Sequence, residues 1–249
     1  MPELGPASWD GAMRAAALLA VDPVRLGGAR LRGPAGPVRE AWRRALAAML
    51  PAAIPLLRVP AGVDDGRLLG GLDLAASLRA GRPMVQSGLL AAANGGILMI
   101  SMAERLEPGA AGRIAEALDR GVVRLEREGL SREMPARFGL CLLDEGLEDE
   151  APPPVLLDRL ALDLDLSALS VRDVEEPELA PETITAARER LGAIGSGAAA
   201  IDEVCEAAAA LGIASVRAPL LALAAARANA ALRQAEAVEQ EDLEVAVCL

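Results

Sequence analysis

Short, wholly apolar segments alternate with helical patterns along the first part of the chain, and this alternation most constrains the fold. The clearest segment is residues 97–100, Ile-Leu-Met-Ile, which follows two glycines and precedes polar residues. Residues 138–143 repeat the pattern. A short run without polar residues is typical of a strand buried on both faces of a parallel sheet. Weaker strand candidates are residues 26–31, 54–59 and 160–166.

Helical spacing separates these strand candidates. Ser8 is expected to cap a first helix through residue 19, and Pro37 suits the first turn of a helix over residues 38–50. The remaining pattern predicts a loop over residues 64–71, helices over 72–78, 111–118 and from 152 through 159, and a β-hairpin formed by 122–126 and 130–134.

The organisation changes after an acidic, proline-punctuated stretch over residues 175–181. Beyond it only helical patterns occur, over residues 184–191, 198–211, 215–234 and from 239. Strands alternating with helices, followed by helices alone, predict an α/β parallel-sheet domain over residues 1–177 and a small all-α domain over 178–249.

Composition excludes several kinds of site. The chain contains no histidine, which rules out His-dependent triads, His-ligated metal sites and His proton shuttles. A net charge of -11 argues against a nucleic-acid partner, which binds basic surfaces. No segment approaches the ~18 uninterrupted apolar residues of a membrane span.

The three cysteines, Cys141, Cys205 and Cys248, are far apart in sequence and match no zinc-binding spacing. Each lies in an apolar run. We therefore expect all three to be reduced core residues of a cytoplasmic protein.

A glycine-containing segment after the first strand candidate has the frame of a nucleotide phosphate loop without its chemistry. A working loop follows G-x-x-x-x-G-K-[ST]: backbone N–H groups cradle the phosphates, the lysine reaches the outer phosphates and the hydroxyl holds Mg²⁺. Here Gly33 opens the frame and Gly36 lies inside it, but Val38, Arg39 and Glu40 replace the second glycine, the lysine and the hydroxyl. No lysine occurs anywhere in the chain. The pattern predicts a degenerate nucleotide site, with an ordinary glycine-rich strand-to-helix turn as the alternative.

Two acidic segments could attract a cation. Asp64 and Asp65 are adjacent, so their carboxylates point in different directions, and a solvated loop is favoured. Residues 144–150 are predicted to form an exposed loop that attracts Mg²⁺ at most weakly. No metal site is predicted.

Several further segments carry a resemblance when they are taken in order. They are DDGRLLGGLD at residues 64–73, GLLAAANGGIL at 88–98, EREGL at 126–130 with PARF at 135–138, and LLDR at 156–159. Together they resemble the magnesium chelatase branch of the AAA+ ATPases. The resemblance implies a P-loop NTPase-like AAA+ parallel-sheet domain with a β-hairpin insert, followed by an all-α lid domain.

The chain departs from the smaller, ATP-hydrolysing subunit of that family. In that subunit Asp-Glu would follow the strand at residues 97–100, whereas here Ser101 and Met102 follow it. Asp144 and Glu145 occupy the position of a sensor that is usually Asn. These departures are similar to the larger D subunit, whose AAA+ module is degenerate and is followed by an acidic linker and an integrin-like domain. Because the chain ends inside an apolar helical pattern, we expect it to be the front part of a longer polypeptide.

The resemblance implies a non-hydrolysing subunit of magnesium chelatase, a ligase that forms a nitrogen–metal bond. Such a subunit would associate with itself into a ring, six-fold in the family, and serve as a platform for the ATPase I subunit. The H subunit would bind the porphyrin. The complex would use ATP and Mg²⁺ to insert Mg²⁺ into protoporphyrin IX on the way to chlorophyll or bacteriochlorophyll, while this chain itself would bind nucleotide weakly or not at all.

Two arginines match functional positions of the family. Arg159 matches an arginine finger, which acts in trans on the nucleotide of a neighbouring subunit; the alternative is an ion pair with Asp158 or Asp163 on a solvated face of a helix. Arg217 matches the sensor-2 arginine, which contacts the γ-phosphate from the lid; the alternative is an ordinary arginine at a helix start. The resemblance also places the hairpin over residues 122–134, with Arg124, Arg127 and Glu128, at a ring contact or the central pore.

Two other functions stay open at this point. One is an active AAA+ ATPase with an atypical arginine-containing loop. The other is a stand-alone regulatory interaction module of the same family.

Overall fold

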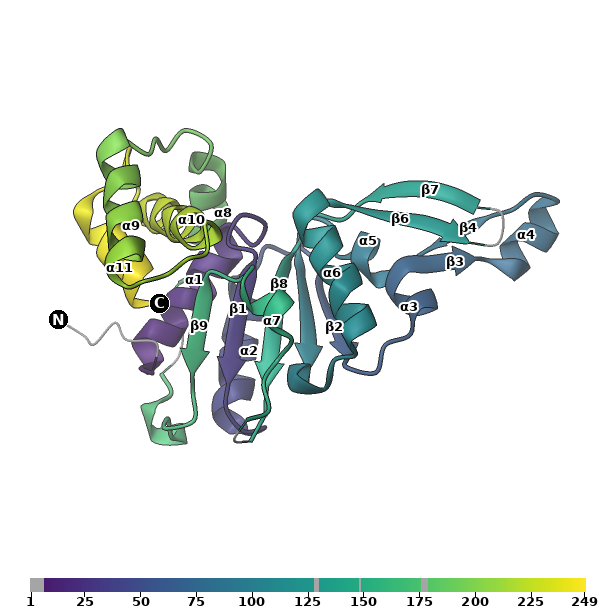
Figure 1. Ribbon diagram of the computed structural model, residues 1–249, viewed down its shortest axis with the longest axis horizontal. Helices are drawn as coiled ribbons and strands as arrows, with labels where there is room; N and C mark the ends of the chain where they lie inside the picture. Colours follow the sequence, from purple (N-terminus) through teal and green to yellow (C-terminus); the bar gives the residue numbers. More distant parts are fainter. Residues whose placement is uncertain (1–6, 128–129, 148, 176–178) are drawn as a thin grey trace.

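A five-stranded parallel sheet in the order β2-β5-β8-β1-β9 forms the centre of the protein (Figure 1). The computed structural model describes residues 7–127, 130–147, 149–175 and 179–249. The sheet strands are β1 (Gly28–Arg32), β2 (Leu56–Pro60), β5 (Ile97–Ser101), β8 (Gly139–Asp144) and β9 (Leu162–Asp165), and all their pairings are parallel. The five strands that the sequence predicted for this sheet are confirmed.

Strands β5 and β8 carry apolar side chains on both faces of the sheet. Ile97 and Met99 of β5 pack into one hydrophobic cluster, whereas Leu98 and Ile100 pack into the other. Successive strand side chains point to opposite faces, so an uninterrupted apolar run is required where helices cover both sides. The first face carries α1 (Trp9–Val21) and α2 (Pro37–Met49); the second carries α5 (Leu89–Ala92), α6 (Pro108–Arg120) and α7 (Pro154–Leu157).

Helices α1 and α2 are joined by a buried polar contact. Ser8 caps α1 as predicted, because its side chain accepts a hydrogen bond from the backbone N–H of Gly11 at 3.0 Å. The fully buried Trp42 of α2 donates from its indole nitrogen to the carbonyl of Ala12 in α1 at 2.7 Å. This bond fixes how the two helices lie against each other under the sheet.

An arm projects beyond the β2 edge of the sheet (Figure 1). It contains α3 (Asp65–Leu69), β3 (Gly70–Leu72), α4 (Leu74–Ala80) and β4 (Val85–Ser87), and the antiparallel hairpin of β6 (Val122–Arg127) with β7 (Leu130–Pro135). The hairpin prediction is confirmed. The predicted loop over residues 64–71 is wrong, because Asp64 accepts a hydrogen bond from the N–H of Arg67 and so caps the short helix α3.

Four helices follow the sheet domain. They are α8 (Pro181–Arg190), α9 (Ala198–Ala210), α10 (Arg217–Leu232) and α11 (Gln240–Cys248). Helices α8 and α10 pack on α1, and α9 and α11 pack on α10. Inside this helical unit, Asn229 donates to the fully buried Asp242 at 2.8 Å, and Arg233 pairs with the same carboxylate. The predicted domain boundary between residues 177 and 178 lies outside the described residues. The remaining short helices are η1 (Ala103–Arg105) and η2 (Val171–Asp173).

The prediction that all three cysteines are core residues is wrong for two of them. Cys141 is fully buried in β8, and burial raises the pKa of its thiol to about 12. Cys205 and Cys248 are exposed, because α9 and α11 each pack by one face only and these residues lie on the other. Among the described residues, no helix is both long and apolar enough to cross a membrane.

Replacing Trp42 with Phe should lower the free energy of unfolding by about 2–4 kcal/mol, since the substitution removes the bond to Ala12 and leaves space beside it. Urea unfolding followed by circular dichroism measures the change. Arg44→Ala, on the exposed side of the same helix, should change it by less than about 0.5 kcal/mol. Equal effects of the two substitutions would contradict this account of the core.

Candidate functional site

The predicted phosphate-loop segment joins β1 to α2 at the carboxyl edge of the sheet. Gly33 has φ 144°, in the left-handed region that favours glycine, and its N–H donates to the carbonyl of Asp144 at 3.0 Å. Gly36 is the N-cap of α2 and, having no side chain, leaves the first N–H groups of the helix without a side-chain cap. The backbone therefore retains a helix N-terminus of the kind that can receive an anion.

The arginine of this loop is bound by a carboxylate of the same chain. Arg39 Nη2 lies 2.7 Å from Glu145 Oε1, and Arg39 Nη1 lies 3.4 Å from the carbonyl of Gly33. Both side chains of the ion pair are largely covered, with 13% of Arg39 and 27% of Glu145 exposed. Glu40 pairs with Arg43, and the hydrogen bond from Arg43 holds the pKa of Glu40 below its ordinary value.

Further acidic groups surround the same edge. The backbone N–H of Glu145 donates to Glu104 Oε2 at 3.1 Å, and the Glu104 side chain is almost fully buried. Asp144 is buried at the end of β8, so the prediction that residues 144–150 form an exposed loop is wrong at its start; Glu148 lies outside the described residues. Each of these two carboxylates also has an arginine beside it, since Arg30 Nη1 lies 3.9 Å from Asp144 Oδ2 and Arg105 Nε lies 3.6 Å from Glu104 Oε1.

The residues that follow β5 do not supply the Mg²⁺ ligands that the phosphate-loop segment lacks. Ser101 ends β5, and Met102, with φ 51° and 43% of its surface exposed, follows it. Neither side chain carries a carboxylate for Mg²⁺. Within the part of the chain that the structure describes, no group of three or more Cys, Asp or Glu side chains could hold a metal ion.

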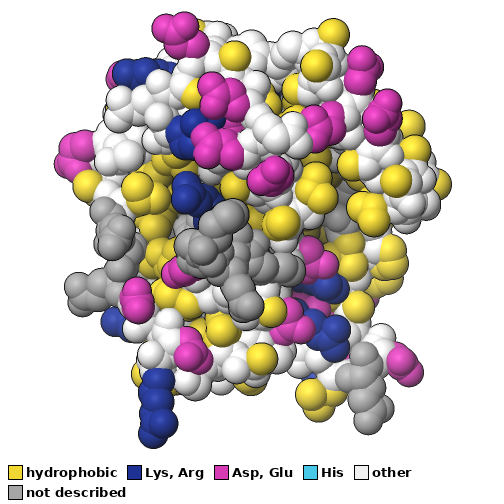
Figure 2. All heavy atoms as spheres, turned by 90° about the vertical axis from the view of Figure 1, so that its left-hand side faces the viewer, with side chains coloured by type: hydrophobic (Ala, Val, Ile, Leu, Met, Phe, Trp, Pro, Cys, Tyr) yellow, Lys and Arg dark blue, Asp and Glu magenta, His cyan; other side chains and the backbone are white. Residues whose placement is uncertain are grey.

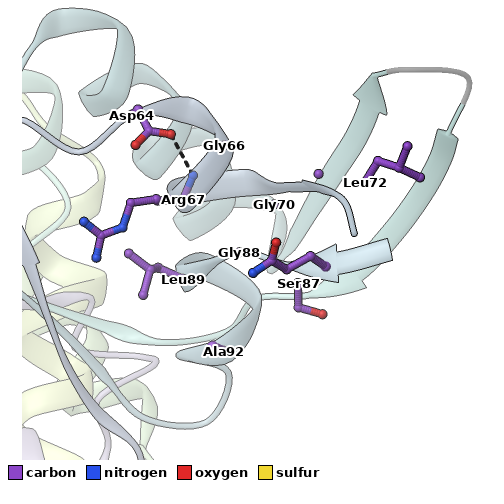
Figure 3. Close-up of a pocket in the computed structure, with 11 residues that line it drawn as sticks. Asp64, Gly66, Arg67, Gly70, Leu72, Ser87, Gly88, Leu89 and Ala92 are labelled. Atoms are coloured by element: carbon purple, nitrogen blue, oxygen red, sulfur yellow. Dashed lines mark hydrogen bonds between the residues drawn. The ribbon is translucent and has the colours of Figure 1, made fainter. Parts of the chain in front are cut away.

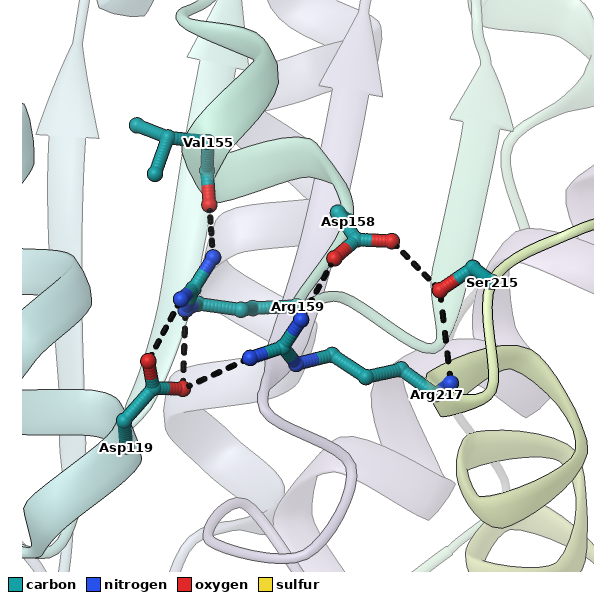
Figure 4. Close-up of polar contacts among 6 residues, drawn as sticks. All are labelled: Asp119, Val155, Asp158, Arg159, Ser215 and Arg217. Atoms are coloured by element: carbon teal, nitrogen blue, oxygen red, sulfur yellow. Dashed lines mark hydrogen bonds and ion pairs between the residues drawn. The ribbon is translucent and has the colours of Figure 1, made fainter.

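Arg159 lies at the opposite, amino edge of the sheet (Figure 4). Helix α7 ends at Leu157, so Arg159 lies in the connection to β9 and not on a helix as predicted. Its Nε donates to Asp119 Oδ1 at 2.9 Å, a second nitrogen pairs with Asp119 Oδ2, and Nη1 donates to the carbonyl of Val155 at 2.6 Å. Only 14% of the side chain is exposed. The alternative of an ion pair with Asp158 or Asp163 is wrong in its partner, because Arg159 pairs with Asp119, whose side chain is 40% exposed.

Arg217 joins the same group from the helical unit (Figure 4). It is the first residue of α10; its Nη1 lies 2.8 Å from Asp158 Oδ2 and its Nη2 lies 3.3 Å from Asp119 Oδ1. Ser215 donates from its hydroxyl to Asp158 Oδ1 at 2.6 Å. We call these five residues, Asp119, Asp158, Arg159, Ser215 and Arg217, the arginine cluster. It connects the helical unit to the sheet domain.

The parallel sheet separates the arginine cluster from the phosphate-loop segment. A Cβ on Gly27, before β1, would lie 1.8 Å from the carbonyl oxygen of Arg159, so Arg159 sits where β1 begins. Gly33 follows the other end of the same strand. At ~3.3 Å per residue the strand is about 15 Å long. In this conformation Arg159 and Arg217 do not reach the chain's own loop. The action of Arg159 on a neighbouring subunit and the contact of Arg217 with a γ-phosphate from the lid both stay predictions.

Sequence reasoning missed the acidic partners of these arginines. Asp119 lies in the last turn of α6, where the helix dipole favours a base over an acid. That unfavourable position is the one local signal that Asp119 has a partner elsewhere. Glu145 was predicted to lie in an exposed acidic loop at the position of a sensor residue, and its pairing with Arg39 joins positions too distant in sequence for spacing to predict.

A hollow of about 460 Å³ lies at the base of the arm, between α3, β3, β4 and α5 (Figure 3). Its glycines permit close backbone approach, since a Cβ on Gly88 would lie 2.4 Å from the backbone nitrogen of Gly70. Arg67 and the capping residue Asp64 are its charged lining residues, and Asp65 pairs with Arg113 at 2.5 Å. The two adjacent aspartates thus serve a helix cap and an ion pair.

The hairpin of the arm and the outer side of the helical unit form two further surfaces. On the hairpin, Arg124 pairs with Glu133 at 2.8 Å, while the Arg127 side chain and Glu128 lie outside the described residues. On the side that carries the helical unit, hydrophobic side chains reach the surface among acidic ones (Figure 2), and exposed members of that unit include Leu211, Val216 and Leu220.

The parallel sheet, the glycine loop entering α2 and the following helical unit define an AAA-type ATPase fold. A family model described as AAA lid domain matches residues 201–249. A solved structure titled as a putative ATPase from Cytophaga hutchinsonii is similar with a TM-score of 0.67 and 14% identity, covering 97% of this chain and 81% of that one. The predicted fold class is confirmed.

Relatives by sequence identify the family. The magnesium-chelatase 60 kDa subunit of Cereibacter sphaeroides is 44% identical over 96% of this chain, and that of Rhodobacter capsulatus is 42% identical over 92%. The magnesium-chelatase 38 kDa subunit of Rhodobacter capsulatus is 31% identical over 91% of this chain and 79% of its own length. The chain belongs to the magnesium-chelatase subunit family. It spans about two-fifths of the length of the 60 kDa relatives (39% and 38%).

Replacing Arg217 with Gln should lower the free energy of unfolding by about 0.5–1 kcal/mol near neutral pH, because the lost ion pairs are partly exposed. Hydrogen bonds from Arg159 and from Ser215 hold the pKa values of Asp119 and Asp158, respectively, below their ordinary values. Carboxylates with lowered pKa values stabilise the fold above the ordinary aspartate pKa of about 3.9, and this contribution is lost as the pH falls through the lowered values.

The difference between wild type and Arg217→Gln should therefore shrink below about pH 4. Urea unfolding at a series of pH values measures it. A difference that grows as the pH falls would show that the cluster does not stabilise the contact between the helical unit and the sheet domain.

Proposed function

We propose that this chain is the degenerate AAA+ module of a magnesium chelatase D-type subunit. It associates into a ring and acts as a platform for an ATP-hydrolysing I-type subunit while Mg²⁺ is inserted into a porphyrin held by an H-type subunit. Its own contribution to the reaction is structural and allosteric. The proposal draws on the higher identity to the 60 kDa than to the 38 kDa relatives, 44% against 31%.

The observation that carries the non-hydrolysing part of the proposal is the ion pair between Arg39 and Glu145. The cation that would meet the outer phosphates already has a carboxylate partner, and Glu40 stands where a Mg²⁺-binding hydroxyl would be needed. Phosphoryl transfer depends on cations placed at the developing charge. Because the one arginine of this loop is neutralised and two further carboxylates lie close by, the loop supplies no such cation.

Arg159 gives the chain a role in the hydrolysis of nucleotide bound to a neighbouring subunit. It lies at the edge of the sheet opposite the loop. In a head-to-tail ring, the edge that carries Arg159 in one subunit would face the loop edge of the next subunit. An arginine supplied in trans can accelerate nucleotide hydrolysis by ~10³–10⁵-fold. We propose that Arg159 serves a neighbouring ATP-loaded subunit, and that Arg217 supports it from the lid.

The isolated chain should show no ATP turnover above background, because the loop lacks a free cation and Mg²⁺ ligands. A coupled phosphate-release assay with Mg²⁺ and ATP measures this, and Arg39→Ala should leave the baseline unchanged. Robust turnover that Arg39→Ala abolishes would favour the alternative of an active ATPase with an arginine loop.

Arg159→Ala should reduce the ATPase rate of the assembled complex at least tenfold, since the guanidinium would no longer reach the phosphates. The assay mixes this chain with the I-type and H-type subunits, ATP, Mg²⁺ and protoporphyrin IX, and follows phosphate release and metallated porphyrin. Arg113→Ala removes another aspartate-paired arginine and should leave the rate within about twofold. Unchanged rates with Arg159→Ala would refute the finger.

A further inference from the structure

Arg159 is held inside its own chain in this structure and is not presented to a neighbour. Asp119 binds it through both carboxylate oxygens, and the carbonyl of Val155 accepts from its remaining terminal nitrogen. Bidentate arginine–carboxylate pairs are the stronger, geometrically specific kind. With 14% of the side chain exposed, the guanidinium must leave this arrangement before it can meet a phosphate on another subunit.

Asp119 is placed where its own helix does not favour it. It lies in the last turn of α6, followed by Arg120 and the left-handed C-cap Gly121. A negative charge there opposes the helix dipole. The carboxylate therefore contributes nothing to α6 that a neutral residue would not, and its structural effect is on the two arginines that it binds.

The same carboxylate also binds the helical unit. Asp119 Oδ1 receives Arg159 Nε at 2.9 Å and Arg217 Nη2 at 3.3 Å. If Arg159 moves away, Asp119 keeps a cation partner in Arg217, and Asp158 keeps both Arg217 and Ser215. Release of Arg159 therefore leaves no carboxylate of the cluster without a partner, which lowers the cost of the movement.

We propose that Asp119 is a positioning residue. It holds Arg159 in an intramolecular ion pair, the stowed state, until the triphosphate of an ATP-loaded neighbouring AAA-type subunit replaces Asp119 as the anionic partner of Arg159. This inference rests on the proposed role of Arg159 in trans. Stowing and engagement compete for one guanidinium, so the chain binds its partner through a minor state in which Arg159 is free. A protein whose competent state is partly populated shows an apparent affinity reduced by that fraction.

Asp119→Asn tests this competition, because it keeps the shape of the side chain and removes its charge. It should not weaken α6, given the position of the acid. In the assembled complex, the concentration of this chain that gives half-maximal stimulation of partner ATPase should fall about tenfold, while the rate at saturation stays the same. The double variant Asp119→Asn with Arg159→Ala should lose the gain.

A matched control is Asp163→Asn, which also breaks a bidentate pair, between Asp163 and Arg30. It should leave the half-saturating concentration unchanged. NMR of ¹⁵N-labelled arginine Nε–H groups reads the stowed state without any partner: the Arg159 signal should be protected from exchange in the wild-type chain and lose protection in Asp119→Asn.

The outcomes separate the two proposals. If Arg159→Ala abolishes stimulation while Asp119→Asn leaves the half-saturating concentration unchanged or raises it, stowing is overturned and the finger stands. If neither substitution changes the ATPase, both proposals fail. A protected Arg159 signal that persists in Asp119→Asn would also overturn stowing, whatever the ATPase shows.

Discussion

The ion pair between Arg39 and Glu145 is the interaction on which the account of this chain depends. It occupies the mouth of a loop whose backbone still has the form of an anion site, with Gly33 in a glycine-favoured conformation and the start of α2 uncapped. The arginine of the loop has a carboxylate of the same chain as its partner.

The parallel sheet then decides where the remaining cations lie. Because β1 and β9 run in the same direction, the loop after β1 and the connection before β9 are at opposite edges. Arg159 and Arg217 gather at one edge with two aspartates, while Arg39 and several glutamates gather at the other. The sheet therefore separates these two groups of charged residues.

The sequence predicted the elements whose cause is local. β5 and β8 were predictable because strands covered on both faces must be apolar throughout. The start of α1 was predictable because its Ser8 cap is a local signal. The arm was less predictable, since β3 and β4 are three residues each and the role of Asp64 as a helix cap depends on its bond to the N–H of Arg67. Cys205 lies in the alanine-rich α9 and Cys248 follows Val245-Ala246-Val247 in α11, so the sequence around each is apolar although each residue is exposed.

The partners of the site residues could not be predicted in the same way. Arg159 was identified by its motif, but Asp119, Asp158 and Ser215 come together through the fold. The same holds for Glu145 beside Arg39. The motifs identified the arginines, and the structure shows the carboxylates that bind them.

Equilibrium binding of Mg²⁺·ATP to the isolated chain tests the central claim most directly. Titration calorimetry with wild-type protein should detect no saturable binding at millimolar nucleotide, because Glu145 and its acidic neighbours hold the loop cation and repel the triphosphate. Micromolar binding by the wild-type chain, unchanged in Glu145→Gln, would contradict the account.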